Sequence, residues 1–211
     1  MDEMTICYFL EDIAHERFLK ALVARLAEEQ GLSPDRLIHD VRNASGGRGK
    51  VLEEFRQFLD DLSRQSGTPD VLVVAVDGDC VGYRQRREAI LRIANQKEYK
   101  GLMACAVPNP HIERWYLADP EPLQRIAGIQ PVCPRYKCQR DLYKQALRDV
   151  FLKAGVTPLL GGAKYGEDIA REIDIYKVGR IDTGFKHFVE DLRTAFSSYL
   201  SFAHPDHRTM E

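Results

Sequence analysis

The sequence predicts an α/β protein in which helices cover both faces of a mostly parallel, Rossmann-like sheet. The run from Val71 to Val76 is apolar at every position, as expected for a central strand that is buried on both faces. Short β-prone runs alternate with amphipathic helical segments along residues 5–107. This alternation is typical of parallel strands that are joined by helical crossovers.

The elements of the first half follow from the spacing of apolar residues. Strands are expected where β-prone apolar residues run together or alternate, over residues 5–10, 36–41, 71–76 and 101–107. Helices are expected where apolar residues recur every three or four positions, over residues 13–29, 51–62 and 83–97. A short helix is expected over residues 108–115, with Trp115 in the core.

The second half of the chain has a helical pattern. Helices are expected over about 142–154, 167–173 and 185–202, with loops around residues 131–134 and 160–162. We therefore expect an α/β core formed by residues 1–118 and a mainly helical C-terminal region, residues 119–211, packed on that core.

Composition and charge exclude several classes of protein. The chain has 211 residues, 44% of them hydrophobic and 29% charged, which excludes a collagen-like or mostly disordered protein. The formal net charge is -2, so any phosphate-binding surface has to be local. No apolar run approaches the roughly 18 residues of a membrane span.

The location expected from the sequence is the cytoplasm, without membrane association. The first four residues are acidic where a signal peptide would be basic. The cysteines are odd in number and scattered along the chain, which favours reduced and mostly buried thiols; they are Cys7, Cys80, Cys105, Cys133 and Cys138.

Acidic residues follow the ends of three predicted strands. Glu11 follows the first strand, Asp77 and Asp79 follow the central one, and Glu113 lies shortly after the last. Ligands of parallel sheets bind at the carboxyl ends of the strands, where these carboxylates would repel one another without a cation. Oxygen ligands suit Mg²⁺ or Mn²⁺. An Asp-Gly-Asp sequence alone fits a solvated loop equally well, but its conjunction with Glu11 favours a metal site.

These residues resemble a known family. The segments 9–11, 16–19 and 73–79 look like the TOPRIM domain, the metal-binding fold of topoisomerases, primases and OLD-type nucleases. The segments 108–119, 162–165 and 185–188 are similar to parts of small stand-alone TOPRIM-like proteins. Those proteins include RloB-like and abortive-infection components, which are often encoded beside an ABC-type ATPase in antiphage systems.

The resemblance implies a nuclease that hydrolyses DNA or RNA with Mg²⁺ or Mn²⁺ and acts in antiphage defence with an ABC-type ATPase partner. It implies that Glu11 is a metal ligand or general base and that Asp77 and Asp79 bind the ion. It further implies that Glu113 serves a second ion and that Lys164 assists catalysis.

The chain departs from the family pattern directly after Glu11. The family usually has a glycine after the glutamate and an acid four residues on, where this chain has Asp12 and His15. Asp12, His15 or Glu16 is a candidate for the second metal site; a site for one ion is the alternative. A homo-oligomer is compatible with the sequence.

Two basic segments are candidate phosphate contacts. Arg84, Arg86 and Arg87 lie at the start of the helix that follows residues 77–79, the acidic loop. They could contact phosphates of a substrate, and a solvated helix face is the alternative. In the segment 46–50, a backbone phosphate cradle with Arg48 and Lys50 and a plain connector are equally good interpretations. This segment fails the P-loop pattern at both ends, which excludes ATP hydrolysis by this chain.

Three functions compete at this point. The leading one is the metal-dependent nuclease. The second is a non-catalytic TOPRIM-fold subunit that binds nucleic acid or a partner, which the unusual Asp12 and His15 favour. The third is a nucleotide-sugar glycosyltransferase, which also places Asp-x-Asp after an apolar strand but has no need of Glu11 or Glu113. A zinc site at Cys133 and Cys138 has too few ligands to be favoured.

Overall fold

Four parallel strands form one sheet in the order β2-β1-β3-β4. The computed structural model describes residues 3–46, 49–65, 67–139 and 141–203. The strands are β1 (Met4–Leu10), β2 (Leu37–Asn43), β3 (Val71–Ala75) and β4 (Leu102–Ala106). The α/β class and the parallel sheet predicted from the sequence are therefore confirmed.

Helices make up most of the remaining described chain. They are α1 (Ile13–Glu29), α2 (Val51–Arg64), α3 (Tyr83–Gln96), α4 (Glu113–Ala118), α5 (Pro120–Ala127), α6 (Leu142–Lys153), α7 (Gly166–Glu172), α8 (Ile175–Ile181) and α9 (Thr183–Ala203). Two short 3-10 segments are η1 (Pro34–Arg36) and η2 (Leu159–Tyr165). Within the ranges that the structure describes, no helix has both the length and the apolarity needed to cross a membrane.

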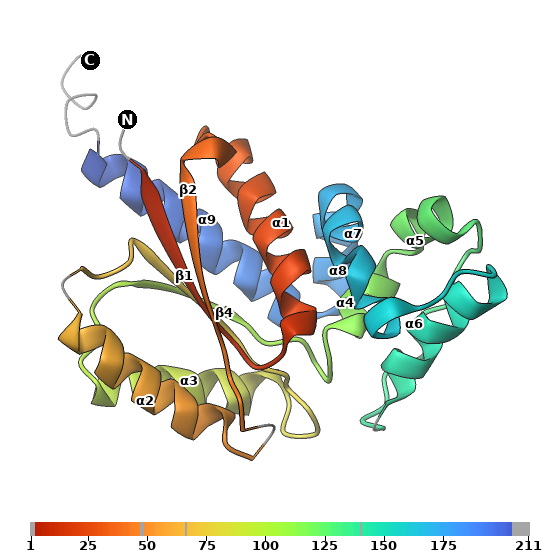
Figure 1. Cartoon of the computed structure of the whole chain (residues 1–211), viewed down its shortest axis with the longest axis horizontal. Coiled ribbons are helices and arrows are strands. Elements are labelled where there is room, and N and C mark those ends of the chain that lie inside the picture. Colours follow the sequence, from red (N-terminus) through yellow and green to blue (C-terminus); the bar gives the residue numbers. More distant parts are fainter. Residues whose placement is uncertain (1–2, 47–48, 66, 140, 204–211) are drawn as a thin grey trace.

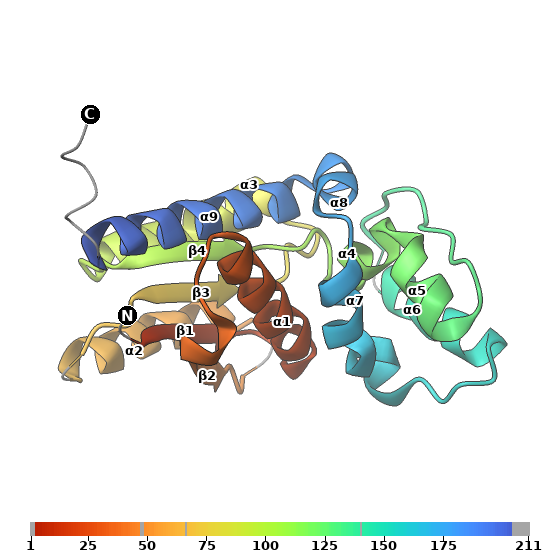
Figure 2. The same cartoon turned by 90° about the horizontal axis from the view of Figure 1, so that it is seen from above.

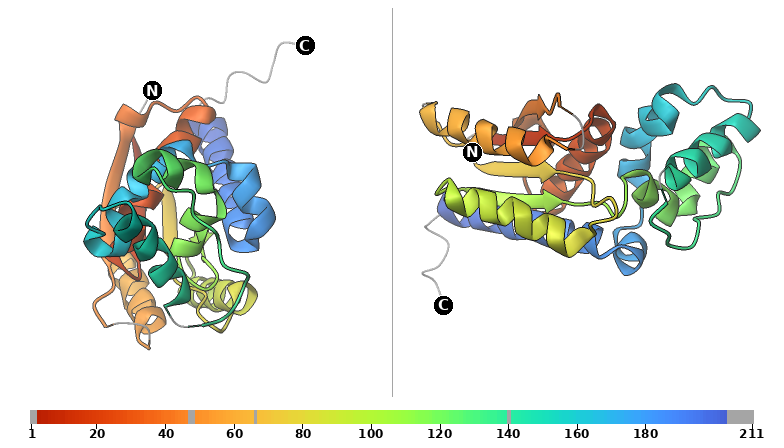
Figure 3. Two further views of the ribbon diagram at one scale, coloured as in Figure 1. Left: turned by 90° about the vertical axis from the view of Figure 1, so that its right-hand side faces the viewer. Right: turned by 90° about the horizontal axis from the view of Figure 1, so that it is seen from below.

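Each face of the sheet is covered by a pair of helices. Along β1, Ile6 and Tyr8 pack into the cluster that contains α1 and α9, while Cys7 and Phe9 pack against α2 and α3. This alternation follows from the two-residue period of a strand. Figures 1 and 3 show the resulting three layers, with α1 and α9 on one side of the sheet and α2 and α3 on the other.

The helices α4 to α8 gather beyond the carboxyl ends of the strands (Figure 2). The chain then returns through α9, which packs along β4 and against α1. Residues 119–203 thus supply most of this helical region and also α9, which forms one layer of the α/β unit together with α1. The edge of the sheet that faces the helical region is the edge at which Glu11 and Asp77 follow their strands.

The prediction for residues 108–115 was wrong in part. The chain stays irregular through Ile112, and α4 begins at Glu113. Pro110 disfavours the helical conformation of Asn109, the residue before it, which explains the late start. Trp115 is fully buried in the core, as predicted.

Candidate functional site

The candidate site lies where the strand order changes direction, between β1 and β3. Crevices at such switch points are the usual ligand sites of open α/β sheets. Leu10 pairs with Ala75, so the two strands end level with each other. The backbone N–H of Glu11 donates to the carbonyl of Ala75 at 2.9 Å, and Oε2 of Glu11 accepts from the backbone N–H of Asp77 at 2.8 Å. Glu11 and the acidic loop therefore meet, as the sequence predicted.

Asp77 is held between two buried histidines. Its Oδ1 lies 3.1 Å from Nε2 of His15, and its Oδ2 lies 3.0 Å from Nδ1 of His111. His15 is 1% exposed, His111 2% and Asp77 7%. The other ring nitrogen of His15, Nδ1, faces the carbonyl oxygen of Asp12 at 3.2 Å. Both nitrogens of His15 thus face acceptors, an arrangement that suits the doubly protonated imidazolium.

The negative charge of Asp77 and the positive charge of the histidines that flank it, His15 and His111, stabilise one another. Burial disfavours the imidazolium of His15, but the negative charge of Asp77 and the hydrogen bond to it outweigh burial and raise the pKa of His15 to about 9. Burial likewise disfavours the Asp77 carboxylate, but His15 and His111 hold the pKa of Asp77 well below its usual range. Burial and the charge of Asp77 raise the pKa of Glu11. The centre of the site is therefore a compensated ion pair beside a carboxyl group that ionises reluctantly.

Gly78 and Asp79 bend the acidic loop against the segment that follows β4. The N–H of Gly78 donates to the carbonyl of Pro108 at 2.7 Å, and the N–H of Asp79 donates to that of Pro110 at 3.0 Å. A Cβ on Gly78 would lie 3.0 Å from the Pro108 oxygen, so glycine permits this close approach. Asp79 adopts a left-handed φ of 46°.

Asp79 faces the same histidine as Asp77. Its Oδ1 lies 3.9 Å from Nδ1 of His111, and its Oδ2 lies 3.5 Å from Nη2 of Arg86. The carboxylates of Asp77 and Asp79 thus both approach Nδ1 of His111. Arg86 supplies a positive charge at the edge of the group.

Glu113 is the least compensated acid near the site. It is 7% exposed, and its Oε2 has no hydrogen-bond partner among the described residues. Burial raises the pKa of Glu113; the charge of Lys144 opposes the rise and that of Asp77 adds to it. Glu113 thus offers a buried oxygen that is available to a ligand.

The other predicted arginines of α3 separate into two roles. Arg87 forms an ion pair with Asp191 of α9, with Nη2 at 3.1 and 3.2 Å from the two carboxylate oxygens. Asp191 also accepts from the backbone N–H of Cys105 in β4, so Arg87 joins α3, α9 and the sheet rather than facing the acids. Arg84 is exposed.

The structure does not bring Lys164 to the acidic site. Lys164 is exposed in η2, and its Nζ lies 5.9 Å from the ring centroid of Tyr165. None of the hydrogen bonds or ion pairs between described residues joins it to Glu11, Asp77 or Asp79. A catalytic role for Lys164 stays a prediction from the resemblance.

The glycine-rich loop before α2 is partly occupied by the chain itself. The backbone N–H groups of Ser45 and Gly46 donate to the carboxylate of Glu54 at 2.7 and 2.6 Å. These two amides are therefore engaged by an internal anion. Lys50 is exposed at the start of α2, and Arg48 lies outside the described residues.

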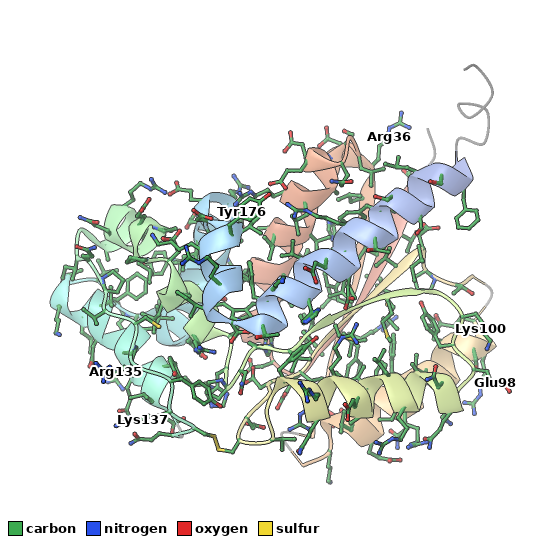
Figure 4. The ribbon with its side chains drawn as sticks, turned by 180° about the vertical axis from the view of Figure 1, so that it is seen from behind. Arg36, Glu98, Lys100, Arg135, Lys137 and Tyr176 are labelled. Carbon is green, nitrogen blue, oxygen red and sulfur yellow. A yellow bond between two sulfur atoms is a disulfide. The ribbon has the colours of Figure 1, made fainter. Side chains whose placement is uncertain are left out.

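A disulfide joins the acidic loop to the helical region. Cys80, the residue after Asp79, is bonded to Cys138, and their Cα atoms are 5.4 Å apart. Figure 4 draws this bond in yellow. The expectation of five reduced thiols is wrong for this pair; Cys7, Cys105 and Cys133 are free. The bond also removes Cys138 as a zinc ligand.

The sequence interpretation missed His111 as a site residue. The same rule that located the acids could have found it, because His111 follows the end of β4 at the carboxyl edge of the sheet. It also missed Asp182, a buried acid 68 positions from its partner Arg114, whose Nη1 donates to Asp182 Oδ2 at 2.5 Å. That pair has no local sequence signature.

The donor set suits a hard divalent cation only in part. Carboxylate oxygens of Glu11, Asp77, Asp79 and Glu113 are the ligand type that Mg²⁺ and Mn²⁺ prefer, and the unpartnered oxygen of Glu113 is a ready donor. In the part of the chain that the structure describes, however, no three or more His, Cys, Asp or Glu side chains are already arranged to hold a metal ion. Asp77 would have to exchange a histidine for the cation.

Comparison of the chain with protein-family models, with curated proteins and with solved structures finds no match.

Proposed function

We propose that the chain is a divalent-metal-dependent nuclease of the TOPRIM type. The observation that carries the proposal is the contact between Glu11 and the backbone of Asp77 at 2.8 Å, across the switch point of the sheet. It gathers acids from two central strands at one edge, with Asp79 and Glu113 beside them. Phosphodiester hydrolysis is the chemistry that such a cluster suits, because it depends on positioning and electrostatic stabilisation.

In this proposal Glu11, Asp77 and Asp79 hold the cation and Glu113 supports it from α4. A bound Mg²⁺ or Mn²⁺ would supply Lewis-acid stabilisation of the charge that develops on the phosphate oxygens. His15 and His111 orient Asp77 through its two carboxylate oxygens. Arg86, at 3.5 Å from Asp79, lies where it can attract the phosphate backbone to the site.

One observation favours the second candidate, a non-catalytic subunit of the same fold. Both oxygens of Asp77 are engaged by histidines, so the described side chains are not preorganised around a cation. A binding subunit would keep this closed ion pair for stability alone. Calorimetric titration with Mn²⁺ separates the two candidates, because only the nuclease requires a site that binds the metal at up to millimolar concentration.

The test of the nuclease is a cleavage time course on plasmid DNA, single-stranded DNA and tRNA, with and without Mg²⁺ or Mn²⁺. We expect metal-stimulated cleavage that Asp77→Asn reduces by about 100-fold or more, the usual loss when one electrostatic stabiliser of a transition state is removed. The matched control is Asp61→Asn, which removes an exposed acid paired with Arg64 on α2. Cleavage that survives Asp77→Asn would contradict the assignment.

The resemblance alone extends the proposal to antiphage defence with an ABC-type ATPase partner. Co-expression with the ATPase encoded beside this chain, if there is one, followed by co-purification and a cleavage assay with ATP, tests that extension. We expect ATP-dependent control of cleavage in the complex. Equal cleavage by the isolated chain and by the complex would contradict regulation by such a partner.

A further inference from the structure

A pocket of about 350 Å³ lies next to the candidate site, on the other side of the loop that carries His111. Its lining includes Tyr83, Arg84, Asn109, Arg114 and Tyr136. Asn109 stands between Pro108 and Pro110, the two residues whose carbonyls bind the amides of the acidic loop. The segment 108–110 therefore borders both the pocket and the acidic loop.

Tyr136 forms a fixed aromatic platform in this pocket. It is 50% exposed, and the guanidinium carbon of Arg114 lies 5.0 Å from its ring centroid. Its hydroxyl donates to Oδ1 of Asn109 at 3.3 Å. Arg114 is itself fixed, because it donates to the carbonyls of Asn109 at 2.8 Å and Ile181 at 2.9 Å and pairs with Asp182. The ring is thus oriented before any ligand binds.

Arg84 and Arg114 bring positive charge into the pocket, and two further basic residues are neighbours of Tyr136 in the chain. Arg135 and Lys137 flank Tyr136 in the chain, and Arg84 lines the pocket from α3. All three are exposed, and none of them takes part in an ion pair with another described residue. Figure 4 shows Arg135 and Lys137 at the outer edge of the molecule, projecting away from the helical region. An aromatic face bordered by cations is the arrangement that takes a base by stacking and its phosphates by charge.

The disulfide ties this platform to the acidic loop. Cys138 lies two residues after Tyr136, and its partner Cys80 directly follows Asp79. A strand that is bound at the acids therefore passes a stacking surface whose position is fixed covalently relative to them.

We infer that the pocket binds an unpaired base of the nucleic acid, so that the substrate strand enters the site single-stranded. This inference rests on the proposed nuclease function, because it names the form of substrate for that same site. A base inside a duplex is stacked on both faces and offers no face to a tyrosine, whereas an unpaired or extruded base does.

Fluorescence anisotropy in EDTA tests the pocket without any cleavage. Three probes with the same fluorescein label are compared. They are octathymidine, an octamer of abasic sites, and a blunt duplex of eight base pairs. We expect the wild type to bind octathymidine about tenfold more tightly than the abasic octamer, the gain typical of one stacked base. The duplex should bind no more tightly than the abasic octamer.

Substitutions assign this preference to the pocket. Tyr136→Ala should bind octathymidine and the abasic octamer equally, whereas Tyr136→Phe should keep the preference because it keeps the ring. Tyr176→Ala is the control, since Tyr176 is an exposed tyrosine of α8 that Figure 4 places far from Arg135 and Lys137. It should leave both affinities unchanged.

Several results would overturn the inference. They are an equal affinity of the wild type for octathymidine and the abasic octamer, the absence of binding to either, tighter binding of the duplex, and a base preference that survives Tyr136→Ala. The comparison of probes on the wild type stands even if a variant does not fold. The binding assay contains no metal, so its result is independent of the cleavage assay. Base-dependent binding by a protein that does not cleave would reject the nuclease and keep the pocket. Cleavage by a protein without a base preference would keep the nuclease and reject the pocket.

Discussion

Asp77 and Glu113 are both buried acids near one site, yet their surroundings differ. Asp77 has an imidazole on each oxygen, so its charge is compensated inside the protein. Glu113 has an oxygen without a partner among the described residues. A buried charge is costly unless it is paired. The two residues should therefore respond to substitution in opposite directions, which separates a structural role from a ligand-binding one.

Asp77→Ala should destabilise the protein by about 3 kcal/mol, because breaking a buried ion pair leaves its partners uncompensated. His15 and His111 would both lose their acceptor. Urea unfolding at pH 7 measures the effect. A loss within a few tenths of a kcal/mol would mean that the trio contributes little to stability and that the histidines find other partners.

Glu113→Gln should raise the free energy of unfolding in EDTA by on the order of 1 kcal/mol, because it removes a buried charge that lacks a partner. The raised pKa of Glu113 means that the folded state holds its proton more tightly than the unfolded chain. Wild-type stability should therefore fall as pH rises past the unfolded value of about 4.3, and the gain in the variant should be larger at pH 8 than at pH 4. Unfolding curves at the two pH values check this; a destabilised variant at pH 8 would contradict it.

At the scale of elements, Asp119 joins two short helices. Its side chain accepts from the backbone N–H of Glu121 in the first turn of α5, from the N–H of Asp174 before α8, and from Nζ of Lys177 at 2.8 Å. Burial alone would raise the pKa of Asp119, but these hydrogen bonds outweigh it and lower that pKa. Helices of seven or eight residues are marginal alone, so this shared carboxylate supports both.

Asp119→Ala should lower the free energy of unfolding by about 1 kcal/mol at pH 7, the usual cost of a lost helix cap. Because the folded pKa is lowered, the contribution of Asp119 is present above its unfolded value of about 3.9 and is lost as pH falls through the folded value. The gap between variant and wild type should therefore narrow below about pH 4 in urea unfolding. Asp61→Ala, at an exposed pair, should show almost no gap at either pH.

The long elements could be predicted because their apolar spacing is strong. The helix predicted over 13–29 and the strand predicted from Val71 match α1 and β3. The helices α5 and α8 were missed because each is too short to show a period. A capping signal was nevertheless present, since Asp119 and Pro120 stand at the N-cap and first position of α5. Local chemistry at the helix start carries information that periodicity lacks.

Only the site residues that directly follow a predicted strand could be predicted from the sequence. Glu11, Asp77 and Asp79 could be placed together because parallel strands end at a common edge. The same rule reaches His111, which follows the end of β4, but only the acids at that edge were considered as ligands. The bond between Cys80 and Cys138 spans 58 positions, and pairing among five cysteines cannot be deduced from spacing. Contacts fixed by tertiary packing leave no local pattern.

At the scale of the whole molecule, a disulfide adds a covalent link between the α/β unit and the helical region, which also pack together through α1, α7 and η2. The Cys80–Cys138 disulfide closes a loop that contains α3, β4, α4 and α5. It restricts the unfolded chain more than the folded one, and bonds that close long loops restrict it most.

Reduction with dithiothreitol should lower the free energy of unfolding by about 2–4 kcal/mol. The double variant Cys80→Ser, Cys138→Ser should start at the lower value and be insensitive to the reductant. Cys133→Ser, which removes a free thiol, should remain as sensitive as the wild type. Urea unfolding with and without dithiothreitol measures all three, and equal stability of the oxidised and reduced wild type would contradict a structural role for the bond.

The return of α9 to the sheet affects how the protein can be made. Phe185 and Phe188 of α9 belong to the same apolar cluster as Ile6 and Tyr8 of β1. A nascent chain leaving the ribosome therefore leaves the part of this sheet face that α9 covers, chiefly along β4, exposed to water until α9 has been translated. Premature termination or proteolytic cleavage between β4 and α9 would leave that apolar surface exposed. Fragments of this protein should therefore be degraded or aggregate rather than remain folded and functional.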